Sequence, residues 1–479
     1  MNVITVMSDE HSYQMMQFID KSILKTPNLD RLAAEGVVFD RCYSTCPVCA
    51  PARASFFTGR YVGRIGTWDN STPYDGTVEG ISHRLNKHGK RFACIGKTHF
   101  YVHGDYGFDY EQYAGYMSRP DVGCYFRGER MGKPEAGKRY QNVSLKTEES
   151  YDDRVLEASL QWLEEHHAEQ GWHLYVGFLD PHFPFRVKPE NWEYYEERIP
   201  CVPDVLKPPF TSLNEPLNCL RSYFMCEDLP EETVRRLLIG YCCAVTELDE
   251  RLGILLDRID ALGIREQTAF LYTSDHGEQL GFHGLWWKCT MFERSAHIPL
   301  LMRVPGLAPR RVDAPVDLCD LFPTLCELME VPPPEGIDGQ SLLALARKGT
   351  DPARRDFAFS EYHAHGMPDG SFMIFWNHYK YVYYCYAAPQ LFQLDSDPQE
   401  DHDLLLERPQ DPQVRMAEQE CHRRLLSVCN PYEVDARAKD YQARMKKALN
   451  VSSYGDPTEG WIPYPENTVG APSRRMPNA

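Results

Sequence analysis

The segment Val3-Ile4-Thr5-Val6-Met7-Ser8-Asp9-Glu10-His11 passes abruptly from an apolar, β-branched run to a polar cluster. A run that is apolar on both faces is typical of a buried strand in a parallel sheet. The same pattern recurs at three later places: Phe92–Ile95 before Gly96-Lys97-Thr98-His99, Leu174–Leu179 before Asp180-Pro181-His182, and Ala269–Thr273 before Ser274-Asp275-His276-Gly277. Because ligands of such sheets bind beyond the carboxyl ends of the strands, we expect the four polar clusters to meet at one edge.

Helices are predicted between these strands. In residues 232–260 apolar side chains recur at the spacing of one helix face, and a second helix is predicted over 152–167. Alternating strands and helices predict an α/β fold with a doubly wound, mostly parallel sheet.

The irregular stretches 101–150 and 183–230 are rich in Pro, Gly and aromatic residues. We interpret them as rim loops that shape substrate access.

The chain is predicted to divide into an α/β domain, residues 1–345, and a smaller α+β subdomain, residues 346–479. The segment Val331-Pro332-Pro333-Pro334-Glu335-Gly336 is expected to form a hinge near this boundary. An antiparallel sheet with one helix is predicted for the subdomain, from strands at 372–376, 379–384 and 391–395 and a helix at 411–428. Residues 450–479 are expected to form an extended arm.

The composition limits the partners of the chain. It has 479 residues, of which 43% are hydrophobic and 25% charged, and a formal net charge of -18. Such an acidic chain is not expected to bind nucleic acid or an anionic membrane. No apolar run approaches the roughly 18 residues that a membrane span needs, and the N-terminus enters a strand without a leader. Sixteen cysteines without the spacing of a small disulfide framework then predict reduced thiols and a cytoplasmic location.

The stretch Cys46-Pro47-Val48-Cys49-Ala50-Pro51-Ala52-Arg53-Ala54-Ser55-Phe56-Phe57-Thr58-Gly59-Arg60 is expected to carry a reactive residue at a helix N-terminus. Pro51 suits a first helical turn and Gly59 suits the far end, so a helix should begin at Cys49. The unpaired N–H groups and dipole of a helix N-terminus bind anions and favour a negatively charged nucleophile. Arg53, one turn later, adds a planar cation that can bind a tetrahedral oxyanion through two donors.

Two other interpretations of this stretch stay open at this point. Cys46 and Cys49 form a C-x-x-C pair, which occurs in redox sites and in halves of zinc sites, although no second pair with suitable spacing completes a zinc set. Alternatively, Cys49 is an unreactive buried residue at the start of a helix.

A metal site is predicted from the residues that follow two of the strands. Asp9, Glu10, Asp275 and His276 supply oxygen donors and one imidazole, a set that suits calcium, magnesium or manganese better than zinc. The alternative for each of these residues is a helix cap or a solvated turn.

Cys49-Ala50-Pro51-Ala52-Arg53 resembles the C-x-P-x-R signature of the sulfatases, with Ala52 where Ser is commoner. Residues 26–33 and 58–60 also resemble sulfatase sequences, and further matches near residues 9, 97, 182, 275 and 288 extend the resemblance over most of the first 345 residues. The resemblance implies an alkaline-phosphatase-like fold and hydrolysis of sulfuric esters. It also implies that Cys49 is oxidised to formylglycine (3-oxoalanine) by a formylglycine-generating enzyme, and that a divalent metal, most often Ca²⁺ and otherwise Mg²⁺ or Mn²⁺, is bound.

The resemblance further implies a role for each strand-end residue. The metal ligands would be Asp9, Glu10, the residue at position 49, Asp275 and His276, with Glu10 a departure from the usual Asp or Gln. The hydrated aldehyde at position 49 would attack sulfur, assisted by Arg53, while Lys97 and Lys288 bind the diol and the sulfate. His182 and Lys288 would protonate the leaving alcohol, and His99 would take a proton from the second hydroxyl to expel sulfate.

The substrate body is less well defined by the sequence. Polar and aromatic residues on predicted loops are candidates for contacting a sulfated sugar, an aryl group or a small cationic alcohol such as choline: Trp68, Asn70, Trp287, Glu361, His363 and His365. The alternative is that these residues pack a domain interface. The segments around Asp9 and Trp68 also show a weak resemblance to a bacterial group related to choline sulfatases.

Two functional alternatives remain at this stage. Related enzymes use the same C-x-P-x-R nucleophile to hydrolyse phosphonate monoesters or phosphodiesters, although Lys97 and His99 favour a sulfatase. A sulfatase relic that binds sulfate without turnover is the other alternative, which the intact set of strand-end residues disfavours. The sequence leaves open whether the chain forms a homo-oligomer.

Overall fold

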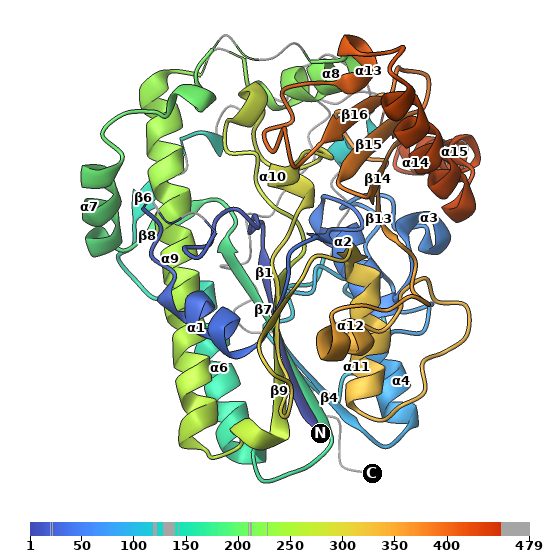
Figure 1. Cartoon of the computed structure of the whole chain (residues 1–479). Coiled ribbons are helices and arrows are strands. Elements are labelled where there is room, and N and C mark those ends of the chain that lie inside the picture. Colours follow the sequence, from blue (N-terminus) through green and yellow to red (C-terminus); the bar gives the residue numbers. More distant parts are fainter. Residues whose placement is uncertain are drawn as a thin grey trace.

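A computed structural model of the chain describes residues 1–19, 21, 23–117, 122–127, 139–141, 143–208, 210, 213–227 and 229–451. Its centre is an eight-stranded sheet in the order β11-β2-β10-β9-β1-β7-β4-β5 (Figure 1). The strands are β1 (Asn2–Asp9), β2 (Val37–Phe39), β4 (Arg91–Gly96), β5 (Tyr110–Gln112), β7 (Trp172–Pro181), β9 (Thr268–Ser274), β10 (Leu300–Arg303) and β11 (Arg310–Val312). Neighbouring strands from β9 to β5 run parallel, whereas β10 is antiparallel to both β9 and β2. The predicted α/β fold with a mostly parallel sheet is confirmed.

The pairing register brings the predicted strand ends to one edge of the sheet. Within β1, Ser8 lies opposite Ser274 of β9, and Asp9 lies opposite Pro181 of β7. Gly96 of β4 lies opposite Gly177 of β7. The polar residues that follow these four strands therefore leave the sheet at the same edge.

Strand β1 is buried on both faces because helices cover both sides of the sheet. Ile4 and Val6 pack in one hydrophobic cluster with residues of α1 (Pro27–Glu35), α6 (Tyr151–His166) and α9 (Glu231–Ala261). Val3 and Met7, on the opposite face, pack with α2 (Cys49–Thr58), α4 (Ile81–Lys87) and α11 (Leu321–Leu328). The two helical layers flank the sheet in Figure 1. Alternation of side chains along the strand therefore supplies a core residue to each layer in turn.

The C-terminal part contains an antiparallel sheet of four strands, as its sequence pattern indicated for three of them. These are β13 (Phe357–Tyr362), β14 (Ser371–Trp376), β15 (Tyr379–Tyr384) and β16 (Gln390–Gln393), and α14 (Pro412–Val428) packs on this sheet. Strand β13 and helix α15 (Pro431–Ala448) were not predicted. Glu361 interrupts the apolar pattern of β13, and α15 buries polar Asp435 and Gln442 in place of a wide apolar stripe.

The stretch 183–230 is more regular than expected. It contains β8 (Phe185–Val187), which pairs with β6 (Val143–Leu145), and the helices α7 (Pro189–Arg198) and α8 (Glu215–Phe224). Proline near each helix start and the Asn214 cap of α8 are the local signals that the prediction overlooked. The remaining elements are β3 (Cys42–Tyr43), α3 (Val62–Ile65), α10 (Glu293–Ala296), β12 (Val316–Asp317), α12 (Leu343–Lys348), α13 (Leu404–Glu407) and the 3-10 turns η1 (Val122–Tyr125), η2 (Asp204–Leu206), η3 (Arg265–Gln267), η4 (Phe282–Gly284) and η5 (Leu318–Asp320).

Two further predictions concern the domain boundary and the C-terminal arm. The predicted boundary after residue 345 falls inside α12 and stays a prediction. The predicted arm at 450–479 lies outside the described residues, apart from 450 and 451. In the part of the chain that the structure describes, every helix is too short or too polar to cross a membrane.

A buried carboxylate holds α1 against α9, and its removal should destabilise the fold. Asp249 of α9 accepts hydrogen bonds from the main-chain N–H groups of Asn28, at 3.0 Å, and Leu29, at 2.7 Å. We expect Asp249→Ala to lower the free energy of unfolding by about 1–3 kcal/mol, since the buried Leu29 N–H and the half-buried Asn28 N–H both lose their acceptor. Asp257→Ala, which removes an exposed partner of Arg31, should cost less than about 1 kcal/mol. Equal losses in chemical denaturation would contradict the capping role.

Candidate active site

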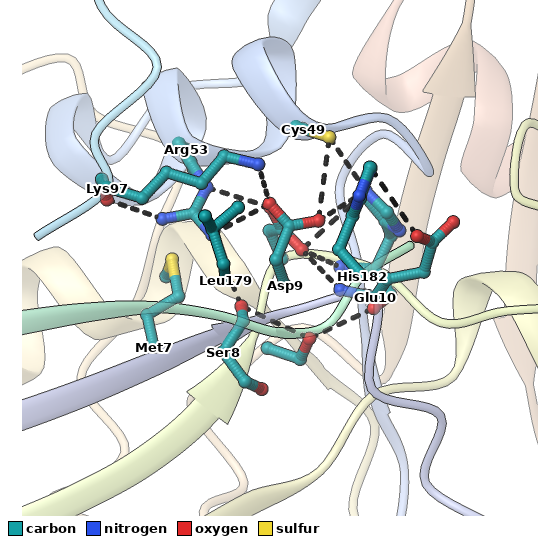
Figure 2. A network of polar contacts seen from close by, with 12 residues as sticks. Met7, Ser8, Asp9, Glu10, Cys49, Arg53, Lys97, Leu179 and His182 are labelled. Atoms are coloured by element: carbon teal, nitrogen blue, oxygen red, sulfur yellow. Dashed lines mark hydrogen bonds and ion pairs between the residues drawn. The ribbon is translucent and has the colours of Figure 1, made fainter. Parts of the chain in front are cut away.

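Cys49 is the first residue of α2, and its thiol points at the carboxyl ends of the strands (Figure 2). The Asn70 side chain accepts a hydrogen bond from the Ala50 N–H group at 3.0 Å, which satisfies one donor of the first helical turn. Helix α2 ends at Gly59, whose φ of 64° lies in the left-handed region. The predicted bounds of this helix are thereby confirmed.

Four ligand-type side chains converge at the start of α2. One donor atom from each of Asp9, Cys49, Asp275 and His276 lies within 4.8 Å of the others, and all four residues are buried. The Cys49 Sγ atom lies 3.1 Å from His276 Nε2 and 3.7 Å from Asp9 Oδ1. Two carboxylates and an imidazole in this arrangement fit a divalent cation.

The imidazole of His276 is prepared for ligation. Burial lowers the pKa of His276 to about 3, so the ring is neutral. Its Nδ1 atom lies 3.0 Å from the Gly277 carbonyl oxygen and donates to it, so the Nε2 lone pair faces Asp9 and Cys49. The neutral tautomer with a free Nε2 lone pair is the form that binds a metal ion.

Arg53 is fully buried beneath this cluster. Its guanidinium donates to Asp275 Oδ2 at 2.8 Å, to Asp9 Oδ2 at 3.3 Å and to the Lys97 carbonyl oxygen at 2.7 Å. The Tyr175 hydroxyl accepts a further bond at 2.8 Å. Arg53 therefore binds the two carboxylates of the predicted metal site, a role that its place in the sequence did not reveal. Tyr175 was also missed, because nothing in an apolar strand pattern distinguishes it.

The electrostatics of the site are set by burial. Burial raises the pKa of the Cys49 thiol to about 12. The unmodified thiol is therefore held in its protonated form, mainly by desolvation, and the expectation that the helix N-terminus favours an anionic nucleophile at this position stays a prediction for the modified residue. Burial also lowers the pKa of Lys97, whose ammonium group forms an ion pair with Asp9. His99 lies buried just beyond β4, and burial together with Lys97 lowers its pKa.

His182, Lys288 and Glu10 form a second group beside the first. Lys288 Nζ lies 2.7 Å from His182 Nε2 and 3.0 Å from Glu10 Oε1. Burial lowers the pKa of His182. Burial also opposes the charge on Lys288, but the interactions with Glu10, Cys49 and Cys289 together raise its pKa. The positive charge therefore resides on Lys288, which donates to a neutral His182. Glu10 lies outside the four-residue group but forms a triplet of ligand-type residues with Asp9 and His182.

The residues predicted to contact the substrate body fall into separate places. Trp68, Glu361 and His363 are buried together: Glu361 accepts hydrogen bonds from Gly63 N–H at 2.7 Å and from His363 Nε2 at 2.8 Å, and the rings of Trp68 and His363 lie 5.5 Å apart. His365 packs against Tyr223. Trp287 packs against Phe183 at 4.1 Å between ring centroids, and it directly precedes Lys288. Of these candidates, Asn70 contacts the main chain next to Cys49, Trp287 precedes Lys288, and His365 Nε2 lies 3.7 Å from the Sγ atom of Cys289, which follows Lys288.

A comparison of the sequence with models of protein families shows the family of this chain. The family model described as Sulfatase matches residues 1–331. The chain belongs to the sulfatase family. A second model, described as the C-terminal part of N-sulphoglucosamine sulphohydrolase, matches residues 281–429 of this sulfatase. The predicted family is confirmed, and with it the prediction that the protein is a sulfuric ester hydrolase.

Individual relatives agree with the family. The sulfatase is 30% identical over 443 residues to choline-sulfatase of Rhizobium meliloti (strain 1021), covering 86% of this chain and 83% of the relative. It is 27% identical over 435 residues to human arylsulfatase K, covering 85% of this chain and 80% of the relative.

Solved structures show the same fold. A solved structure of a protein in complex with its substrate D-glucosamine-2-N,6-O-disulfate matches with a TM-score of 0.72 at 20% identity, over 92% of this chain and 98% of the other. The phosphonate monoester hydrolase of Agrobacterium radiobacter matches with a TM-score of 0.70 at 22% identity, over 89% and 95%.

Metal binding by the group of Asp9, Cys49, Asp275 and His276 can be tested without measuring activity. Adding Ca²⁺, Mg²⁺ or Mn²⁺ to chelated protein should raise its melting temperature, since a ligand at 100 times its Kd stabilises the folded state by about 2.7 kcal/mol. Asp275→Asn should remove the metal-dependent part of this shift, whereas Glu10→Gln should retain it. An unchanged shift in Asp275→Asn would show that the ion binds elsewhere.

Proposed function

We propose that this sulfatase hydrolyses a sulfate monoester through a formylglycine nucleophile at position 49, with a divalent cation held by Asp9, Asp275, His276 and residue 49. The observation that carries the proposal is the position of Cys49 Sγ at the start of α2, 3.1 Å from His276 Nε2 and close to both carboxylates. Oxygen donors favour Ca²⁺, with Mg²⁺ or Mn²⁺ as alternatives. The cation would supply positive charge for the sulfate oxygens and would favour ionisation of a hydroxyl at position 49.

Conversion of Cys49 is required because the thiol itself is poorly suited to attack. A buried thiol with its pKa near 12 is protonated at neutral pH and is a weak nucleophile. Oxidation to formylglycine by a maturation enzyme would replace it with an aldehyde, whose hydrate supplies a hydroxyl nucleophile. The sixteen cysteines lack the spacing of a small disulfide framework, which supports a cytoplasmic location in a reducing compartment.

The other residues of the site have separate roles in the proposed reaction. Arg53 fixes the Asp9 and Asp275 carboxylates, and Lys97 places a further cation beside Asp9. A hydroxyl oxygen at position 49 would form a new bond to sulfur as the ester S–O bond breaks. The electron pair of the broken bond would stay on the alcohol oxygen, which takes a proton from Lys288. His182 orients the Lys288 ammonium by accepting its hydrogen bond. His99 would accept the proton of the second hydroxyl. The oxygen that loses this proton would form the C=O bond of the aldehyde, while the C–O bond to sulfate breaks and its electron pair leaves with the sulfate.

The substrate class is a small-molecule or saccharide sulfate ester. Trp287 and Phe183 place aromatic surface next to the Lys288–His182 pair, where the alcohol would leave. Such surface suits a sugar ring, an aryl group or a small alkyl alcohol. The named relatives include a choline-sulfatase and arylsulfatases, and these compounds form the first screening set.

The nucleophile can be tested by mass and by substitution. The peptide that carries Cys49, taken from protein made in its own host, should weigh about 18 Da less than the cysteine form, because an aldehyde replaces the thiol. Cys49→Ala should lower kcat/KM by more than about 10³-fold. Cys46→Ala, which removes another buried thiol of the same stretch, is the matched control. An unmodified thiol in the native host together with sulfate binding but no turnover would favour a non-catalytic relic.

A ratio of activities separates the proposed reaction from its nearest alternative. Matured enzyme should hydrolyse an aryl sulfate with a higher kcat/KM than the corresponding aryl phosphonate or phosphodiester. The reverse order, measured on one preparation, would assign the site to phosphonate or phosphodiester hydrolysis.

A further inference from the structure

The residue pair His182–Lys288 is held from two sides by buried carboxylates that the proposed reaction does not use. His182 follows the end of β7, and Lys288 lies in the loop that follows β9. Neither residue sits in a regular element, so the 2.7 Å contact between their nitrogens depends on how these two chain segments are fixed.

Asp152 fixes the segment that carries His182. It lies in the first turn of α6 and is buried, and its two carboxylate oxygens accept hydrogen bonds from the Leu179 and Asp180 N–H groups, each at 2.8 Å. Asp180 in turn binds Arg251 of α9 at 2.7 Å. The last residues of β7 before His182 are therefore tied to α6 through the main chain and to α9 through a side chain.

Glu278 fixes the segment that carries Lys288. Its Oε1 atom accepts hydrogen bonds from Leu280 N–H at 2.8 Å and from Trp287 N–H at 2.7 Å, which closes the loop next to Lys288. Leu280, His283, Trp287 and Cys289 in and beside this loop all have φ between 53° and 77°. Non-glycine residues in this region cost free energy and persist only where their surroundings hold them.

We propose that Asp152 and Glu278 are positioning residues that set the distance between His182 and Lys288, and thereby the protonation of the leaving alcohol. This inference rests on the proposed function, which places that pair on the leaving-group side. Proton transfer needs heavy atoms within hydrogen-bond reach, and a misplacement of about 1 Å costs on the order of 10²-fold in rate. Each carboxylate receives two main-chain donors, so losing it frees two donors at once.

The two carboxylates respond differently to conversion into amides, which provides an internal control. Asp152 uses both oxygens, so Asp152→Asn keeps an acceptor for only one of the two N–H groups and presents an NH₂ group to the other. Glu278 uses one oxygen for both donors, so the amide oxygen of Glu278→Gln can still accept both bonds. Glu278→Leu removes both acceptors at similar size.

The test measures kcat/KM of matured enzyme for aryl sulfates with progressively poorer leaving groups, from 4-nitrophenyl to phenyl sulfate. A weakened proton donor harms poor leaving groups more than good ones. Asp152→Asn and Glu278→Leu should therefore lose about 10-fold on 4-nitrophenyl sulfate and about 100-fold on phenyl sulfate. Glu278→Gln should lose less than Glu278→Leu on phenyl sulfate. Glu157→Gln, which removes an exposed carboxylate of the same helix α6, should keep the wild-type dependence on the leaving group.

His182→Ala separates failure of this inference from failure of the proposed function. If His182→Ala does not steepen the leaving-group dependence, the assignment of the pair to the leaving-group side is wrong. If it does, but Asp152→Asn and Glu278→Leu lose the same factor on every ester, the two carboxylates support the fold alone and the positioning role is overturned. Should Asp152→Asn fail to fold, the comparison of Glu278→Leu with Glu278→Gln decides the question.

Discussion

The buried guanidinium of Arg53 is the contact on which the site depends. From α2 it reaches Asp9 at the end of β1, Asp275 after β9, the main chain after β4 and Tyr175 within β7. One side chain therefore joins a helix to four neighbouring parallel strands, at the ends of β1, β9 and β4 and within β7. Removing one partner from such a buried pair costs about 3–5 kcal/mol, because the remaining charges lose their compensation. The planar fork of Arg suits this role better than the single ammonium of Lys.

The ionisable side chains around Arg53 form two separate groups. Asp9, Asp275 and His276 face Cys49 and form the group that fits a cation, whereas Lys288, His182 and Glu10 form a second group beside it. Low exposure makes these interactions strong and keeps His276 and His182 neutral. The net charge of -18 opposes an anionic substrate over long distances. In the proposed function, the local cations Arg53, Lys97 and Lys288 supply the attraction close to the sulfate.

Much of this architecture could be predicted from the sequence. Runs such as Val3–Met7 are apolar on both faces, and that pattern requires a sheet covered on both sides, with the polar residues after it at the ligand-binding edge. The bounds of α2 followed from Pro51 and Gly59, and those of α9 from its apolar stripe, to within one residue. The family followed from the short motif around Cys49. These signals are local, since each depends on residues within a few turns of one another.

Contacts between distant segments were decided only by the tertiary structure. Arg53 was expected to bind an anion, but its donors are directed at Asp9 and Asp275, which are 44 and 222 residues away. Trp68, Glu361 and His363 satisfied the pattern of a binding loop but pack against one another. Burial raises the pKa of the Cys49 thiol, and the local sequence does not reveal how deeply a residue is buried. The partners of Glu10, Asp152 and Glu278 likewise depend on which chain segments meet in the folded protein. The sequence alone determined which residues reach the edge of the sheet, and folding determined which of them face each other there, because hydrogen-bond partners in this site come from segments that meet only in three dimensions.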